Sequence, residues 1–119
     1  MRVLAAALAL TAVACTGAAA GGTGQPAVSA RVGLIEWEIT TSTPVLAHGK
    51  ASLTVANAGT TAHDLRVSGA GVDAATPALA PGERAVLSFE VDAGDELVLW
   101  CTIPGHREQG MLRRLPIAD

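Results

Sequence analysis

The chain consists of short segments in which apolar and polar side chains alternate or apolar residues dominate. The alternation is clearest at 51–56 and 85–91, and the other apolar segments are 28–39, 43–47, 63–68, 96–101 and 111–117. Because successive side chains of a β-strand point to opposite faces, a two-residue period predicts a half-buried strand. No segment has a helical period of useful length. The pattern therefore predicts an all-β fold.

Turn-forming residues separate these segments at regular intervals. Glycine, proline, asparagine or aspartate occur at 48–50, 57–59, 80–83 and 92–95, and the stretches 69–82 and 102–110 are predicted to be longer loops. Seven or eight short strands within about 90 residues are typical of an antiparallel Greek-key β-sandwich. That architecture is the predicted fold class.

Composition refines this picture. The 119 residues are enough for one domain, and their net charge of -3 argues against a general nucleic-acid binder, which usually has a basic patch. Aromatic residues are scarce, since Trp37, Phe89 and Trp100 are the complete set. The core is therefore predicted to consist of valine, leucine, isoleucine and alanine, with both tryptophans packed in it.

The first residues have the layout of a secretory signal. Arg2 precedes an uncharged apolar run at 3–14 that is too short to span a membrane. The run ends at Cys15 in the sequence AVAC, which resembles a bacterial lipoprotein box, although alanine stands at position 12 where leucine is usual. This interpretation predicts a signal peptide at 1–14 and lipidation of Cys15. Cleavage after Ala20, at an A-x-A site, is the alternative and would remove Cys15.

Either cleavage site predicts an exported protein, located in the periplasm or at the cell surface. Residues 15–27 are small and predicted to form a flexible tether, so the folded domain is expected at 28–119. Contact with a membrane is expected only through a lipid on Cys15.

Three residues with metal-binding side chains are spaced five apart around the predicted loop before the last strand. They are Cys101, His106 and Met111, in the run CTIPGHREQGM. Thiolate, imidazole and thioether ligands select copper over harder metals, and two His, one Cys and a weak axial Met form electron-transfer copper sites. Cys101 is the one cysteine beyond the leader, and metal ligation would explain an unpaired thiol in an exported protein.

The second imidazole of such a site is either His63 or His48. His63 is favoured because it stands at the start of a predicted strand, where the sheet would hold it in place. The strand and turns between it and Cys101 leave enough chain to bring the two residues together at one end of a sandwich. His48 lies in a predicted turn beside a glycine and is expected to be a surface residue.

The order of these elements resembles the cupredoxins, the small type 1 (blue) copper proteins such as plastocyanin and azurin. The resemblance lies in the segments LTVANAGTTAHDLRV at 53–67, LAPGERAVLSFEV at 79–91 and LVLWCTIPGHREQGMLRRLPI at 97–117. It implies one copper ion, with His63, Cys101 and His106 in a trigonal plane and Met111 as the long axial ligand. It also implies a monomer that exchanges electrons with redox partner proteins.

The resemblance also implies a hydrogen bond beside the ligands. Many cupredoxins have asparagine directly after the first histidine ligand, and it bonds to the hydroxyl residue that follows the cysteine. This chain has Asp64 and Thr102 at those two positions. Asp64 is expected to accept from the Thr102 hydroxyl or backbone N–H, and its charge to lower the reduction potential relative to an amide.

Copper enzymes with related domains need ligands that this sequence lacks. Multicopper oxidases have histidine two positions before the cysteine, where this chain has Leu99. The dinuclear centre of oxidase subunits needs two cysteines in the loop, and copper nitrite reductases need further histidines. The chain is therefore predicted not to be an enzyme. Extracytoplasmic electron transfer is the predicted function, and copper handling (storage, delivery or protection) is the alternative.

Overall fold

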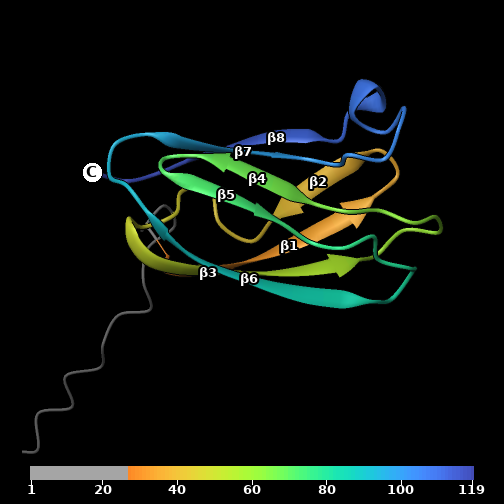
Figure 1. The fold of residues 1–119 in the computed structure, drawn as a ribbon, viewed down its shortest axis with the longest axis horizontal. Coiled ribbons are helices and arrows are strands. Elements are labelled where there is room, and N and C mark those ends of the chain that lie inside the picture. Colours follow the sequence, from red (N-terminus) through yellow and green to blue (C-terminus); the bar gives the residue numbers. More distant parts are fainter. Residues whose placement is uncertain (1–26) are drawn as a thin grey trace, which may run out of the picture.

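The computed structural model describes residues 27–119, which form a sandwich of two four-stranded sheets (Figure 1). The predicted signal peptide, Cys15 and all but the last residue of the predicted tether lie outside the described residues. The strands are β1 (Ser29–Ile35), β2 (Glu38–Thr41), β3 (Gly49–Asn57), β4 (Arg66–Gly69), β5 (Val72–Ala75), β6 (Arg84–Val91), β7 (Glu96–Trp100) and β8 (Leu112–Pro116). A single 3-10 turn, η1 (Arg107–Gln109), lies between β7 and β8.

One sheet has the strand order β2-β1-β3-β6 and the other has β5-β4-β7-β8. All neighbouring strands are antiparallel except β1 and β3, which pair in parallel. The chain passes from one sheet to the other after β3, after β5 and again after β6. The predicted all-β sandwich with seven or eight strands is confirmed, with this one parallel pairing as an addition.

The core between the sheets follows the alternation in the sequence. Every second residue of β3 is buried, and Leu53 and Val55 are fully so. Leu97 and Leu99 of β7, which belongs to the other sheet, are buried in the same core. The core is aliphatic, as predicted, because the described chain has few aromatic residues to place in it.

Trp37 is a correction to the predicted core. Its side chain is 37% exposed and lies in the turn between β1 and β2, not between the sheets. Trp100, at the end of β7, is only half-buried, because its position in the alternation turns it away from the core. Both tryptophans are therefore peripheral.

The structure differs from the predicted strands in two places. The segment 43–47 contains only Leu46 as an isolated bridge, because the Thr43 hydroxyl bonds locally to the Val45 carbonyl and Pro44 has no N–H for a ladder. β5 lies in a stretch predicted to be a loop, after a tight turn at 69–71 in which all three residues have positive φ. Its four small residues gave no alternation to detect.

Two boundaries also differ slightly. His63 forms an isolated bridge with Leu79, and the regular strand β4 starts three residues later at Arg66. Ala27, the last residue of the predicted tether, already bridges to Leu46. No helix among the described residues is long and apolar enough to cross a membrane.

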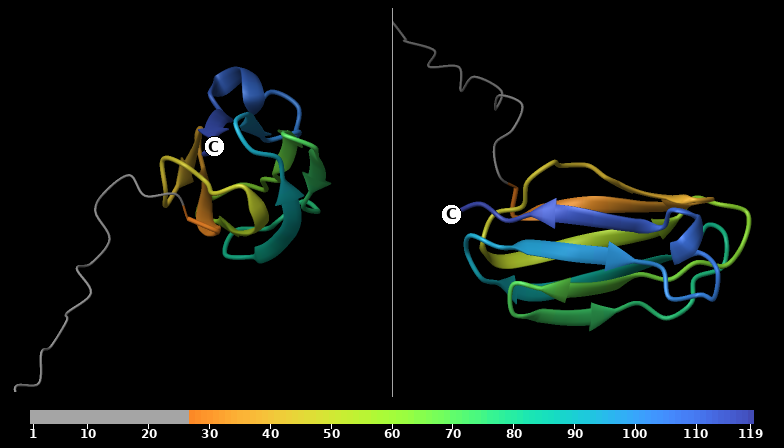
Figure 2. Two further views of the ribbon diagram at one scale, coloured as in Figure 1. Left: turned by 90° about the vertical axis from the view of Figure 1, so that its left-hand side faces the viewer. Right: turned by 90° about the horizontal axis from the view of Figure 1, so that it is seen from above.

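One end of the sandwich gathers the segments of chemical interest. The β1–β2 turn, the segment between β3 and β4, and the loop between β7 and β8 all lie there, as Figures 1 and 2 show. The C-terminus lies at the opposite end, where the exposed His48 contacts the Ala118 carbonyl through Nδ1 at 3.3 Å. His48 is therefore a surface residue far from the other two histidines, as predicted.

Truncation of a core leucine tests the packing of the two sheets. Leu53→Ala should lower the free energy of unfolding by about 2–5 kcal/mol, because it leaves a cavity between the sheets. The matched change Val86→Ala, at a side chain that is 64% exposed, should alter it by no more than about 0.5 kcal/mol. Urea unfolding followed by circular dichroism measures both, and equal losses would contradict this assignment of the core.

Candidate metal centre

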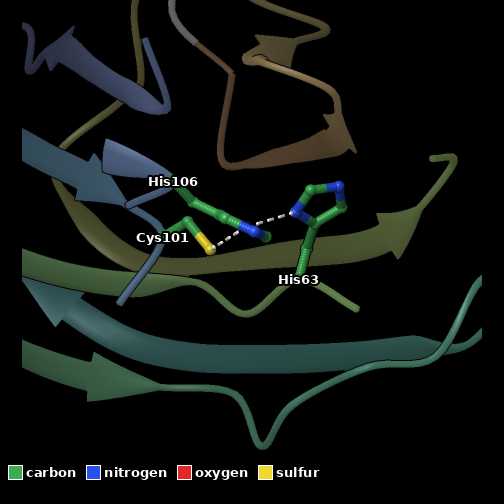
Figure 3. A group of neighbouring side chains, drawn as sticks. All are labelled: His63, Cys101 and His106. Atoms are coloured by element: carbon green, nitrogen blue, oxygen red, sulfur yellow. Dashed lines mark hydrogen bonds between the residues drawn. The ribbon is translucent and has the colours of Figure 1, made fainter. Parts of the chain in front are cut away.

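Three side chains from two separate segments converge at the loop end of the sandwich. His63, Cys101 and His106 each present one ligand atom, and these atoms all lie within 4.8 Å of one another. Nδ1 of His63 is 3.2 Å from Nδ1 of His106, and Sγ of Cys101 is 3.6 Å from the same nitrogen. Figure 3 shows the thiol and the two imidazoles pointing toward a common centre. These are three of the four residues predicted as ligands.

His63 is held by the segment between β3 and β4. Its backbone forms both hydrogen bonds of a bridge with Leu79, at 3.1 and 2.7 Å. The buried Asn57 fixes the preceding turn, because its side chain donates to the carbonyls of Thr61 and Leu79 and accepts from the Gly59 N–H. The imidazole itself is fully buried, so its direction is set by the surrounding protein.

The loop between β7 and β8 closes on itself through its backbone. The Cys101 N–H donates to the Met111 carbonyl at 3.1 Å, and the Met111 N–H donates to the His106 carbonyl at 3.3 Å. A third bond joins the His106 N–H to the Ile103 carbonyl. Met111, the fourth predicted ligand, therefore lies directly beside the other two loop residues, and its side chain is fully buried.

Burial raises the pKa of the Cys101 thiol above its ordinary value. Desolvation is the main cause, since removal from water disfavours the thiolate. The thiol is therefore protonated in the metal-free protein at neutral pH. A bound metal ion would take the thiolate form and release the proton.

Asp64 and Thr102 join the two ligand-bearing segments. The Thr102 N–H donates to Oδ1 of Asp64 at 2.6 Å, and the Thr102 hydroxyl donates to Oδ2. The sequence analysis expected a bond from either the hydroxyl or the backbone N–H of Thr102, and the structure contains both. Because Asp64 follows His63 and Thr102 follows Cys101, this pair of hydrogen bonds fixes the spacing between the imidazole and the thiol.

Glu36 is a part of the site that the sequence analysis missed. Its Oε1 lies 3.0 Å from Nε2 of His63, on the side of the ring opposite Nδ1. The same oxygen accepts from the N–H groups of Thr60 and Thr61 at 2.8 and 2.9 Å. The Thr61 and then the Thr60 hydrogen bonds lower the pKa of Glu36 from 4.5 to about 2, so the group is a carboxylate at neutral pH. No motif in the sequence marks this residue.

Trp37, the next residue, lies against both histidines. Its ring is edge-on to His106 with 4.9 Å between centroids, and edge-on to His63 at 6.4 Å. The carbonyl of Trp37 comes so close to Gly110 that a Cβ there would be 2.7 Å from it. Glycine at this position, with a φ of 129°, therefore lets the β1–β2 turn dock on the metal-centre loop.

The donor set fits a soft or borderline transition metal. One thiol and two imidazoles converge, a thioether residue is buried beside them, and His106 is only half-buried. Such a set suits copper and disfavours the oxygen-seeking ions magnesium and calcium. The three converging atoms are anchored by backbone bonds, a bridge and a carboxylate, so a bound ion would meet ligands that are already in place.

Comparison with known proteins identifies the fold. No protein-family model and no curated protein sequence matches the chain. Among solved structures, reduced auracyanin from Roseiflexus castenholzii is 17% identical over 80% of this chain and all of its own, with a TM-score of 0.65. Auracyanin A, a "blue" copper protein from Chloroflexus aurantiacus, is 14% identical over 76% of this chain and 98% of its own, with a TM-score of 0.58.

Larger copper proteins contain the same fold as a part. A copper-containing nitrite reductase from Thermus scotoductus is 19% identical over 85% of this chain, with a TM-score of 0.56, but this covers only 25% of that protein's length. At these identities the comparisons establish a shared fold. They confirm the predicted cupredoxin-like β-sandwich.

The Asp64–Thr102 link gives a test of how the site is held. Asp64→Ala removes two hydrogen bonds to a charged acceptor and should lower the free energy of unfolding of the metal-free domain by about 1.5–3 kcal/mol. Asp73→Ala is the matched control, because Asp73 makes one exposed ion pair with Arg66 and should cost no more than about 1 kcal/mol. Urea unfolding measures the free energy of unfolding of both variants. An equal loss in the two would mean that the Asp64–Thr102 link does not fix the loops.

Proposed function

We propose that this chain binds one copper ion through His63, Cys101, His106 and Met111, and that it transfers electrons. The observation that carries the proposal is the convergence of the Cys101 Sγ and one ring nitrogen from each of His63 and His106, all within 4.8 Å of one another. They lie at the loop end of a sandwich whose fold is shared with auracyanins. The buried Met111, bonded through its backbone to both Cys101 and His106, is proposed as the weak axial ligand.

The residues support electron transfer because they are held in place independently of a metal. Backbone bonds anchor the loop ligands, the Leu79 bridge anchors His63, and Asp64 ties the two segments together. A bound copper ion would supply the one-electron Cu(II)/Cu(I) couple, and ligands that move little keep the rearrangement on electron transfer small. His106, the less buried of the two histidines, is the proposed exit of the electron toward a partner.

Catalysis by this chain alone is not part of the proposal. The chain spans almost the whole length of the auracyanins but a quarter of the nitrite reductase. Its sequence has three histidines, two at the proposed site and His48 at the opposite end of the sandwich. The chain therefore has no further histidines that could form a second copper centre.

The location of this activity is proposed from the leader sequence. The layout of residues 1–14 supports export, and Cys15 is the proposed site of a lipid that would hold the domain at a membrane surface. Its partners are proposed to be redox proteins in the same compartment, and the domain is proposed to act as a monomer.

The visible spectrum tests the copper site. Copper-loaded protein should show an intense thiolate-to-copper charge-transfer band, and Cys101→Ser should abolish it because an alkoxyl ligand has no such transition. His48→Ala is the control and should leave the band unchanged. Colourless Cu(I) binding in the wild type, with transfer to an acceptor, would favour copper handling instead, and absence of both would contradict the proposal.

The charge of Asp64 tests the link between structure and potential. Asp64→Asn removes a negative charge beside Cys101 and should raise the reduction potential, because the carboxylate favours the more positive Cu(II) state. The amide oxygen can accept from the Thr102 N–H while the amide NH2 donates to the Thr102 hydroxyl oxygen, so the loop geometry should be retained. Protein-film or solution voltammetry measures the shift, and an unchanged potential would refute this role of Asp64.

A further inference from the structure

We propose that Glu36 is a positioning residue of the metal centre, which holds His63 through a carboxylate–imidazole–metal arrangement. The inference rests on the proposed copper site and adds a fifth residue to it. Histidines that bind metals commonly donate their other ring N–H to a carboxylate, carbonyl or water, which fixes the tautomer and orientation of the ring. In this chain the partner is a charged side chain from a different part of the fold.

The carboxylate of Glu36 lies in a cradle built to hold it. Oε1 accepts from the backbone N–H groups of Thr60 and Thr61, and from the Thr61 hydroxyl at 3.0 Å. Gly59 completes the cradle, because a Cβ at that position would lie 2.6 and 2.7 Å from the two carboxylate oxygens. The Glu36 side chain is 22% exposed. The group is therefore fixed by donors and by shape before it meets the imidazole.

The chemistry of the contact sets the tautomer of His63. A carboxylate can only accept, so Nε2 of His63 must carry the hydrogen that occupies the 3.0 Å contact. In the neutral imidazole this leaves the lone pair on Nδ1, the nitrogen 3.2 Å from Nδ1 of His106. The ring is therefore presented to the site with its ligand nitrogen already free of hydrogen.

Through the position of Glu36 in the fold, the turn that contains it connects one sheet with the candidate metal site beside the other sheet. Glu36 and Trp37 form the β1–β2 turn of one sheet, whereas Cys101 follows β7 of the other. Glu36 supports His63 from behind, and Trp37 lies edge-on to His106. One turn therefore contacts both imidazoles.

A charged partner also changes the electronic character of the ligand. Hydrogen bonding to a carboxylate makes the imidazole a stronger donor, and the negative charge favours the higher oxidation state of a bound metal. Glu36 should therefore lower the reduction potential of the centre, independently of Asp64, which acts from the side of Cys101.

Two substitutions separate the positioning role from the charge. Glu36→Ala removes the acceptor, and Glu36→Gln keeps an acceptor of the same shape without the charge. Glu38→Gln is the control, since it removes one charge from an exposed side chain two residues along the chain. The first readout is the tautomer of His63, measured by ¹⁵N NMR in the metal-free protein at mildly alkaline pH. The others are the copper affinity, by competition with a chelator, and the reduction potential, by voltammetry.

Wild type and Glu38→Gln should show a single His63 tautomer with hydrogen on Nε2. Glu36→Ala should show a mixture of tautomers and a copper affinity lower by about 10–100-fold. Glu36→Gln should keep the tautomer and shift the potential upward relative to wild type and control. An unchanged tautomer and affinity in Glu36→Ala would overturn the proposal, as would an unchanged potential in Glu36→Gln if the alanine variant does not fold.

The metal-free measurement separates this proposal from the proposed function. If wild type binds no copper but the tautomer still depends on Glu36, the copper function fails and the Glu36–His63 link stands. If wild type shows the charge-transfer band and the tautomer does not depend on Glu36, the copper function stands and the positioning role fails.

Discussion

The fully buried imidazole of His63 is the constraint on which the candidate site depends. A buried ring has two nitrogens, and each needs a partner because an unpaired buried polar atom is costly. One nitrogen faces the Glu36 carboxylate and the other faces His106 and the thiol of Cys101. With one partner fixed on the outer side, the inner nitrogen is directed at the place where the ligand atoms meet.

The two sheets share the work of holding this arrangement. The sheet β2-β1-β3-β6 contributes Glu36 from its first turn and the end of β3, where Asn57 organises the segment that carries His63. The sheet β5-β4-β7-β8 contributes the loop with Cys101 and His106, closed by its own backbone bonds. Asp64 and Thr102 connect the two sides. Loss of one contact would therefore leave the others, which suits the proposed electron-transfer role, in which the site would have to change little.

The fold of this protein does not by itself determine its function. Sequences 14–19% identical to it adopt the same sandwich, both as whole auracyanins and as one part of a nitrite reductase. The sandwich is a scaffold that brings three loops to one end, and the side chains on those loops decide the chemistry. In this chain two carboxylates contact the segments with the proposed ligands, and the exposed Trp37 lies edge-on to both histidines.

The sequence by itself determined the features that depend only on residues close together in the chain. Alternation in segments such as 51–56 and 85–91 reports a two-residue period, which is a local property of the backbone. The proposed ligand residues were visible because thiol, imidazole and thioether are rare in this chain and regularly spaced. The short β5 was missed because its small residues leave no period, and the strand predicted at 43–47 was wrong because local side-chain bonds replace the ladder there. Only the tertiary structure placed Glu36 behind His63, 27 residues away, and Trp37 against His106. Such contacts arise from how β1 lies between β2 and β3, and no local pattern of residues encodes that arrangement.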